Sequence, residues 1–125
     1  MLTNQEMNKL LANMSDDNNK NIQKIKQAFG NINYKKSNNE SLLHIFVDKK
    51  YNEDLCFKLI KSLLSAGLSP NLEDCFKYNF IQTALYTGYS EDFIINIIKE
   101  SLKYNLDINH VDSDKDTIMH TAIYS

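Results

Sequence analysis

The sequence predicts an all-α protein made of repeated helix–turn–helix units. Three observations support this fold class. Similar six-residue segments recur at a constant interval, the apolar residues between them follow helical spacing, and residues that favour helix ends flank the apolar runs. A helix pair with one broad apolar face cannot bury that face alone, so such units are expected to stack into a solenoid.

The recurring segments establish the repeat. They read SLLHIF, NFIQTA and TIMHTA and start at positions 41, 79 and 117, which gives two equal intervals of 38 residues. The register also holds between the segments without a gap. Residues 51–54 (YNED) align with residues 89–92 (YSED), and the apolar positions that follow are also equivalent. We therefore interpret residues 41–78 and 79–116 as two copies of one unit.

Each unit predicts a short first helix and a longer second helix. In the first copy we expect helices over 42–50 and 53–66, with Asn52 as the N-cap and Gly67 ending the second helix. In the second copy the helices are expected over 80–88 and 91–104. Ser90 is the predicted N-cap there, and the second helix carries a broad apolar face made of Phe93, Ile94, Ile97, Ile98 and Leu102.

The two ends of the chain differ from the central units. Residues 1–40 hold a weaker, more polar copy, with a capping box at Thr3 and Glu6 and a second helix expected over 16–29. A terminal repeat needs a solvated outer face, so this segment is predicted to be an N-terminal capping repeat. Residues 117–125 read as the start of a further repeat, which indicates either a fragment of a longer protein or a terminal half-repeat.

The repeated segments resemble those of ankyrin repeats. Residues 117–122 (TIMHTA) are similar to the T-P-L-H-x-A signature, and residues 66–71 (AGLSPN) with Asp74 look like the segment that leads into the ankyrin hairpin. The chain departs from the family in three ways. The signature proline is absent, Lys77 and Lys115 replace the hairpin glycine, and the period exceeds the usual value of about 33. The surplus falls between the two helices of each unit.

The resemblance implies an ankyrin-like solenoid of stacked helix–turn–helix repeats with short hairpin loops. Residues 1–125 would then form a single ankyrin-repeat domain. Its expected parts are a capping repeat, two full repeats and the start of another, over residues 1–40, 41–78, 79–116 and 117–125.

Composition and charge favour a soluble domain and argue against a membrane-spanning or nucleic-acid-binding protein. The 125 residues are 42% hydrophobic and 24% charged, with net charge −2, which is typical of a soluble domain. No apolar run is long enough for a membrane span. All 14 basic residues are lysine, and the absence of arginine together with the negative charge argues against nucleic-acid binding. Cys56 and Cys75 lie in no metal or redox motif, so both are expected to be reduced thiols.

No constellation for catalysis or metal binding is apparent. His44 and His120 occupy the signature histidine, which the resemblance makes structural, and Gln82 takes that place in the middle copy. His110 is expected to face solvent in a turn. Residues 112–116 (DSDKD) superficially suggest calcium but lack the glycine and terminal glutamate of an EF-hand. We expect no enzymatic activity, no cofactor and no metal.

The resemblance places a binding surface on the hairpin tips and the exposed side of the first helices. Phe76 and Tyr86 are either interface anchors or residues that pack against the neighbouring unit. The candidate partner-binding residues are Phe76, Lys77, Tyr78, Asp114, Lys115, Asp48, Lys49 and Tyr86. Cys75, Ser113 and Thr87 are further candidates at the same loop tips and first helices.

The function that follows from the resemblance is a protein–protein interaction module, a scaffold or adaptor that binds one protein partner and is monomeric. Ankyrin modules of intracellular bacteria are often parts of proteins delivered into host cells. The resemblance therefore suggests a host-targeting effector, an intracellular protein that is delivered into a host cell if its source is a bacterium. The alternative is an N-terminal targeting domain of a larger enzyme whose catalytic domain lies beyond residue 125. The length of the full gene separates these two hypotheses.

Overall fold

The protein is all-α, as the sequence predicts. The computed structural model describes residues 2–115 and 117–118, and this part of the chain contains no β-strand, only an isolated antiparallel bridge between Lys35 and Ser41. Its helices are α1 (Asn4–Ala12), α2 (Asn18–Phe29), α3 (Leu42–Val47), α4 (Glu53–Ser65), α5 (Phe80–Thr87) and α6 (Glu91–Leu102).

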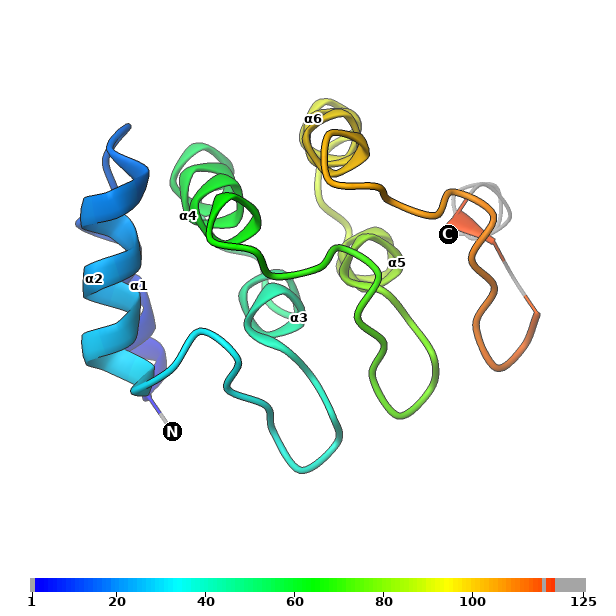
Figure 1. Cartoon of the computed structure of the whole chain (residues 1–125), viewed down its shortest axis with the longest axis horizontal. Coiled ribbons are helices and arrows are strands. Elements are labelled where there is room, and N and C mark those ends of the chain that lie inside the picture. Colours follow the sequence, from blue (N-terminus) through cyan, green and yellow to red (C-terminus); the bar gives the residue numbers. More distant parts are fainter. Residues whose placement is uncertain (1, 116, 119–125) are drawn as a thin grey trace.

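Four of these helices form two layers of equivalent pairs. Helices α3 and α5 lie side by side in one layer, and α4 and α6 lie side by side in the other (Figure 1). Within each pair the shorter first helix also packs on the longer second helix, α3 on α4 and α5 on α6. A long loop projects from the same end of each pair, so the loops also lie next to one another (Figure 1).

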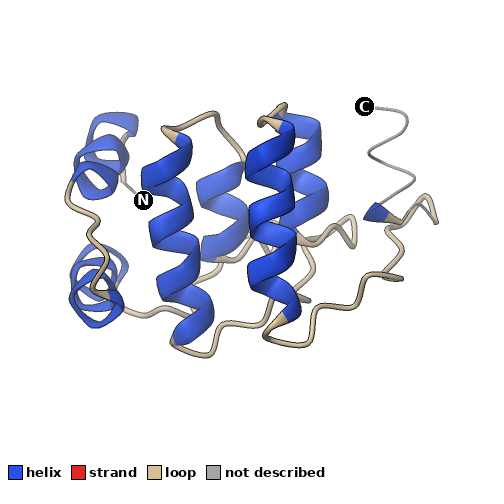
Figure 2. Cartoon of the chain, turned by 90° about the horizontal axis from the view of Figure 1, so that it is seen from above, coloured by secondary structure: helices blue, strands red, loops and turns tan. Residues whose placement is uncertain are grey.

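The N-terminal helix pair is oriented differently. Helices α1 and α2 run crosswise to the other four, as Figures 1 and 2 show. Helix α2 contacts α4, just as α4 contacts α6 in the next unit. Helix α1, however, contacts α4 and not α3. The predicted helix pair in residues 1–40 is therefore present, but its first helix does not repeat the position of α3.

A buried asparagine links the N-terminal helix pair to α4. Asn21 of α2 has no exposed surface. Its amide nitrogen donates to the hydroxyl of Ser62 on α4 at 2.9 Å and to the carbonyl of Ser15 at 2.8 Å, while its amide oxygen accepts the N–H of Ser15 at 2.9 Å. A buried amide is costly unless it is hydrogen-bonded, and here the bonds also fix how α2 sits on α4.

The helix ends agree closely with the cap residues read from the sequence. The hydroxyl of Thr3 accepts the N–H of Glu6 and the Glu6 carboxylate accepts the N–H of Thr3, which completes the predicted capping box. Asn52 and Ser90 accept backbone N–H groups at the starts of α4 and α6. Gly88 ends α5 in the left-handed conformation, with φ of 92°.

Helix α3 is shorter than predicted, ending at Val47 instead of residue 50. The cause lies in the longer connection of the next unit. The hydroxyl of Tyr89 is hydrogen-bonded to the carbonyl of Lys49 and accepts the N–H of Tyr51 at 3.1 Å. Thr87 donates to the carbonyl of Val47 at 2.6 Å. These side chains satisfy backbone groups that a longer helix would have paired internally.

The core is centred on α4. The fully buried aliphatic side chains of this helix are Leu59, Ile60, Leu63 and Leu64, and α4 contacts every other described helix except α5. Burying such an aliphatic side chain stabilises the fold by about 1.5 to 3 kcal/mol. The equivalent side of α6 is less covered, since Leu102 is 50% exposed whereas Leu64, 38 positions earlier, is 0% exposed.

The loops that precede α3, α5 and residue 117 share one backbone conformation. Asn39, Lys77 and Lys115 all have φ between 62° and 66°, the left-handed region that non-glycine residues seldom adopt. Neighbouring loops are also joined by backbone hydrogen bonds. The N–H of Cys75 donates to the carbonyl of Asn38 at 3.0 Å, and the equivalent bond joins the next two loops at 3.0 Å. The loops therefore repeat with the same 38-residue period as the sequence.

We expect Lys77→Gly to raise the stability of the protein. A lysine in the left-handed region costs about 1 kcal/mol or more, whereas glycine adopts it without steric conflict. The greater freedom of glycine in the unfolded chain offsets part of this gain, so the net increase is about 0.5 to 1 kcal/mol. Urea denaturation measures it. The control Lys99→Gly, on the exposed surface of helix α6, should lower stability by about 1 kcal/mol. Destabilisation by both changes would contradict the interpretation.

We expect Asn21→Ala to destabilise the protein by about 2 kcal/mol, because it leaves the N–H of Ser15 without its buried acceptor and the hydroxyl of Ser62 without a donor. Amide hydrogen exchange should accelerate most in α1 and α2. Asn19→Ala on the exposed side of the same helix serves as the control and should change stability by less than about 0.5 kcal/mol. Equal effects of the two substitutions would show that the buried network is not what holds the pair.

Candidate functional site

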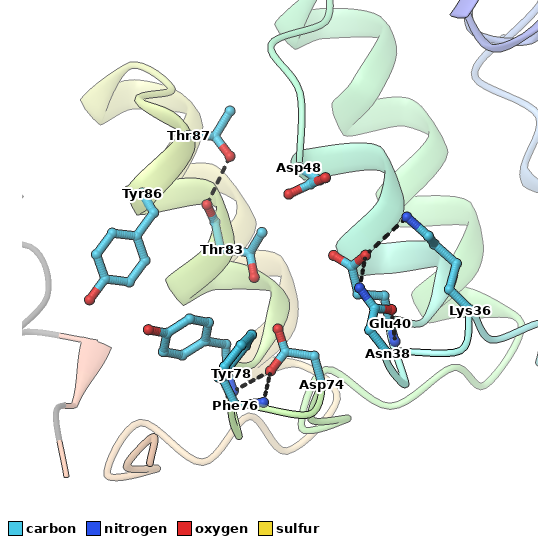
Figure 3. Close-up of a pocket in the computed structure, with 10 residues that line it drawn as sticks. All are labelled: Lys36, Asn38, Glu40, Asp48, Asp74, Phe76, Tyr78, Thr83, Tyr86 and Thr87. Atoms are coloured by element: carbon cyan, nitrogen blue, oxygen red, sulfur yellow. Dashed lines mark hydrogen bonds and ion pairs between the residues drawn. The ribbon is translucent and has the colours of Figure 1, made fainter. Parts of the chain in front are cut away.

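A groove of about 490 Å³ opens between the loops and the helices α3 and α5 (Figure 3). The loop and the end of the first helix of one unit form one side, and the loop and the first helix of the next unit form the other. The groove is positioned by the repeat itself, because each unit contributes one loop and one short helix to it. Its lining residues are Lys36, Asn38, Glu40, Asp48, Asp74, Phe76, Tyr78, Thr83, Tyr86 and Thr87.

Three aromatic rings form one side of the groove. The ring of Tyr78 lies between those of Phe76 and Tyr86, with centroid distances of 6.0 and 5.4 Å (Figure 3). Phe76 is 58% exposed and Tyr86 is 53% exposed. Burial and the neighbouring Tyr86 raise the pKa of Tyr78 to about 12, so its hydroxyl stays neutral. The rings of Phe76 and Tyr86 are therefore accessible in the described part of the chain, while most of the next first helix, against which the alternative would pack them, lies outside it.

Carboxylates occupy the opposite side of the groove. Glu40 is almost fully buried and accepts a hydrogen bond from the Asn38 amide at 2.8 Å, and its carboxylate forms an ion pair with Lys36 at 3.3 Å. Asp48 is exposed at the end of α3, and Figure 3 shows its carboxylate facing the groove. Partial burial and, to a smaller extent, the charge of Glu40 raise the pKa of Asp48.

Asp74 shapes the loop that carries the aromatic residues. One of its carboxylate oxygens accepts the N–H of Phe76 at 2.8 Å and the N–H of Tyr78 at 3.0 Å. The backbone N–H of Asp74 in turn donates to the carbonyl of Tyr78 at 3.1 Å. These bonds close the loop on itself and fix the two rings relative to each other. The groove is therefore a preformed feature of the fold.

The structure brings together only part of the predicted surface. Asp48, Phe76, Tyr78, Tyr86 and Thr87 line the same groove. Lys49 does not line it, and its ammonium group donates to the side-chain oxygen of Asn4 at 2.6 Å.

The other candidates, Cys75, Lys77, Ser113, Asp114 and Lys115, lie on loops but do not line this groove. Lys77 is exposed at the loop tip, where its carbonyl lies 2.6 Å from a ring nitrogen of His110. Asp114 and Lys115 belong to the following loop and are both exposed. They repeat the positions of Phe76 and Lys77, one unit further along the stack.

Five lining residues were not predicted. They are Lys36, Asn38, Glu40, Asp74 and Thr83. The repeat contains the signal for two of them, because Asn38 and Glu40 stand 38 positions before Phe76 and Tyr78. Applying the candidate positions of one unit to the preceding unit finds both.

His44 is a structural residue. Its Nδ1 lies 3.2 Å from the backbone nitrogen of Ser41 and 2.8 Å from the Ser41 hydroxyl, and its Nε2 lies 2.7 Å from the carbonyl of Tyr78. A carbonyl only accepts and a backbone N–H only donates, so the ring is neutral with its proton on Nε2. Both nitrogens are occupied, and the histidine ties one unit to the loop of the next. His120, its predicted equivalent, lies outside the described residues.

His110 does not face solvent, contrary to the prediction. Its side chain is only 11% exposed, and Nε2 lies 2.6 Å from the carbonyl of Lys77 and 3.4 Å from the carboxylate of Glu73. The cause is the stacking of consecutive loops, which covers the turn between units. His110 therefore links neighbouring units as His44 does.

Both cysteines are free thiols, as predicted. Cys56 is buried and its thiol donates to the carbonyl of Phe46 at 3.2 Å, and burial raises its pKa to about 12. Cys75 is exposed on the loop beside Phe76. In the calcium-like segment, one Asp112 oxygen accepts the N–H of Asp114 at 2.8 Å, which is the loop-closing bond also made by Asp74. Asp116 lies outside the described residues.

Within residues 2–115 and 117–118, no group of three or more His, Cys, Asp or Glu side chains is arranged to hold a metal ion. None of the helices in this part of the chain is both long and apolar enough to cross a lipid bilayer. Sequence comparison adds no assignment, since no protein-family model and no curated protein matches the chain.

We expect the stability of the protein to fall in mild acid because of His44. Burial lowers the pKa of this residue below its ordinary value of about 6.5. As the pH falls through about 6.5, the unfolded chain takes up a proton that the folded chain does not bind. Stability is therefore full above about pH 6.5 and decreases below it, by at most about 1.4 kcal/mol per pH unit, until the lower folded pKa is reached.

His44→Gln tests this effect, because Gln82 occupies the equivalent position and forms the same reciprocal bonds with Asn79 at 3.0 Å. Urea midpoints of both proteins are compared from about pH 5 to pH 8. The loss of stability in acid should be smaller in the variant, while the other histidines contribute equally to both. Parallel pH profiles would show that His44 does not titrate differently on folding.

Proposed function

We propose that this chain is an ankyrin-type repeat module that binds a partner protein through the groove between its loops and first helices. The observation that carries the proposal is the aromatic wall of the groove. Phe76 and Tyr86 are both more than half exposed on a preformed surface. Exposed aromatic side chains beside a cavity are typical anchor points for protein partners.

The repeated backbone supports the ankyrin-type assignment. The loops share a left-handed residue at positions 39, 77 and 115, and they are paired by equivalent hydrogen bonds. His44, at the signature position, bonds to the loop of the next unit, as the resemblance leads one to expect. The longer connection between helices is held by Tyr89 and Thr87, so the extra residues extend the unit without changing its layers.

The chemistry of the site supports binding over catalysis. The ring nitrogens of His44 are both engaged by protein groups. The Cys56 thiol is buried, protonated and hydrogen-bonded to a carbonyl. The groove itself contains carboxylates, aromatic rings and hydroxyls but no histidine or cysteine. Side chains of these kinds are suited to contacts with the surface of another protein. They do not include a nucleophile with a general base beside it, which covalent catalysis requires.

A selection of displayed peptides tests the proposal. Random peptides are selected against the wild-type chain, and the affinities of the enriched peptides are measured for the double variant Phe76→Ala/Tyr86→Ala. Both side chains are exposed, so the fold should persist, which circular dichroism and urea denaturation check. We expect the affinity to fall by about tenfold or more, because two central aromatic contacts are lost.

The matched control is Ile95→Ala/Leu102→Ala. These side chains are 40% and 50% exposed on α6, and their removal takes apolar area from another surface. The selected peptides should bind this control as tightly as they bind the wild type. If they bind the groove variant equally well, or lose affinity only for the α6 variant, the groove is not the binding site.

A further inference from the structure

We infer that the partner segment received by this groove presents a cationic side chain, which binds between the aromatic rings and the carboxylates. The inference rests on the proposed function and adds the chemistry of the partner. It follows from three features of the groove: its net negative charge, the positions of its aromatic rings, and a carboxylate and ring faces that are not engaged by other described groups.

The groove carries an excess of negative charge. Its charged lining residues are Glu40, Asp48, Asp74 and Lys36, three carboxylates against one ammonium group. The single lysine is already engaged, since its Nζ lies 3.3 Å from the Glu40 carboxylate. A cation that enters the groove therefore meets a site of complementary charge, and an acidic segment is repelled.

Asp48 is the carboxylate best placed to receive the cation. It is exposed, its carboxylate faces the groove in Figure 3, and this carboxylate makes no hydrogen bond or ion pair with any described residue. Partial burial and, to a smaller extent, the charge of Glu40 raise the pKa of Asp48. A cation bound beside the two carboxylates would favour their ionised forms.

The aromatic side supplies the second half of the contact. Tyr78 lies within 6.0 Å of Phe76 and 5.4 Å of Tyr86, measured between ring centroids, so a side chain entering the groove meets more than one ring. A cation within about 6 Å of a ring centroid is attracted to the face of the ring. Among the described residues, the cation–π contact present is Lys61 over Phe57, outside the groove, so the three rings remain available.

Nuclear magnetic resonance titration with small probes tests the inference directly. The probes are N-acetylarginine amide, N-acetyllysine amide and the neutral N-acetylglutamine amide, added to the ¹⁵N-labelled chain. We expect both cationic probes to shift the amide resonances of Asp48, Phe76, Tyr78 and Tyr86, and to bind more weakly as salt is raised. The neutral probe should leave these resonances nearly unchanged. Equal shifts with the neutral probe would overturn the inference.

Two charge variants localise the binding. Asp48→Asn should weaken the cationic probes by about two- to fivefold, the range expected for one exposed ion pair. Asp16→Asn removes the same charge from a side chain that is 94% exposed and lies outside the groove, and it should have no effect. Equal weakening by both variants, or by neither, would contradict the placement of the cation beside Asp48.

The selected peptides separate this inference from the proposed function. If groove-dependent peptides contain lysine or arginine and lose affinity when that residue is replaced by glutamine, both proposals are supported. If such peptides bind through Phe76 and Tyr86 but tolerate the replacement, the groove binds partners and the cationic inference is wrong. If neither peptides nor cationic probes act at the groove, both proposals fail.

Discussion

The burial of α4 among its neighbours is the interaction on which the rest of the structure depends. Its apolar side chains are covered by α3 of the same unit and by α1, α2 and α6 of the units on either side, and these helices together exclude water from them. Neither the pair α3 and α4 nor the pair α5 and α6 closes a core alone. The two sides of the groove belong to adjacent units, and the packing of α4 against α6 holds these units together. The shape of the groove therefore depends on this packing.

Polar contacts then fix how the units lie on one another. Hydrophobic packing is not directional, and it allows neighbouring units to slide. His44 and Tyr89 each bond to backbone atoms of an adjacent unit, and the bonds between consecutive loops add a further constraint. Asn21 fixes the N-terminal pair in a comparable way. These groups are buried or partly buried, so their bonds must be made in one register for the fold to form.

Most of the fold could be predicted because its signals are local. The N-cap residues Thr3, Asn52 and Ser90 mark the starts of helices through contacts with residues only three positions away. The 38-residue period identifies the equivalent segments. The crosswise setting of α1 could not be predicted in this way. It depends on contacts with α4 that lie far away in the sequence, and no local pattern encodes the angle between two helices.

The site was harder to predict than the fold for a related reason. Candidate residues could be placed on loops and first helices, but the direction of each side chain depends on the packing. Lys49 illustrates this, because it directly follows Asp48 at the end of α3 and yet reaches Asn4. The burial of His110 likewise results from loop stacking, which a single turn sequence does not reveal.

The equal conformation of the loops has a consequence for how such a chain can change in length. Asn39 and Lys77 are interchangeable points on the backbone, so duplicating or deleting the 38 residues between them joins two identical geometries. A change of that size adds or removes one loop and one helix pair and calls for no new kind of contact. Consecutive loops are joined by the same backbone bond, as between the N–H of Cys75 and the carbonyl of Asn38, so an added unit can make this bond too. The length of the surface formed by the loops and first helices can therefore vary in whole units, while its chemistry varies residue by residue.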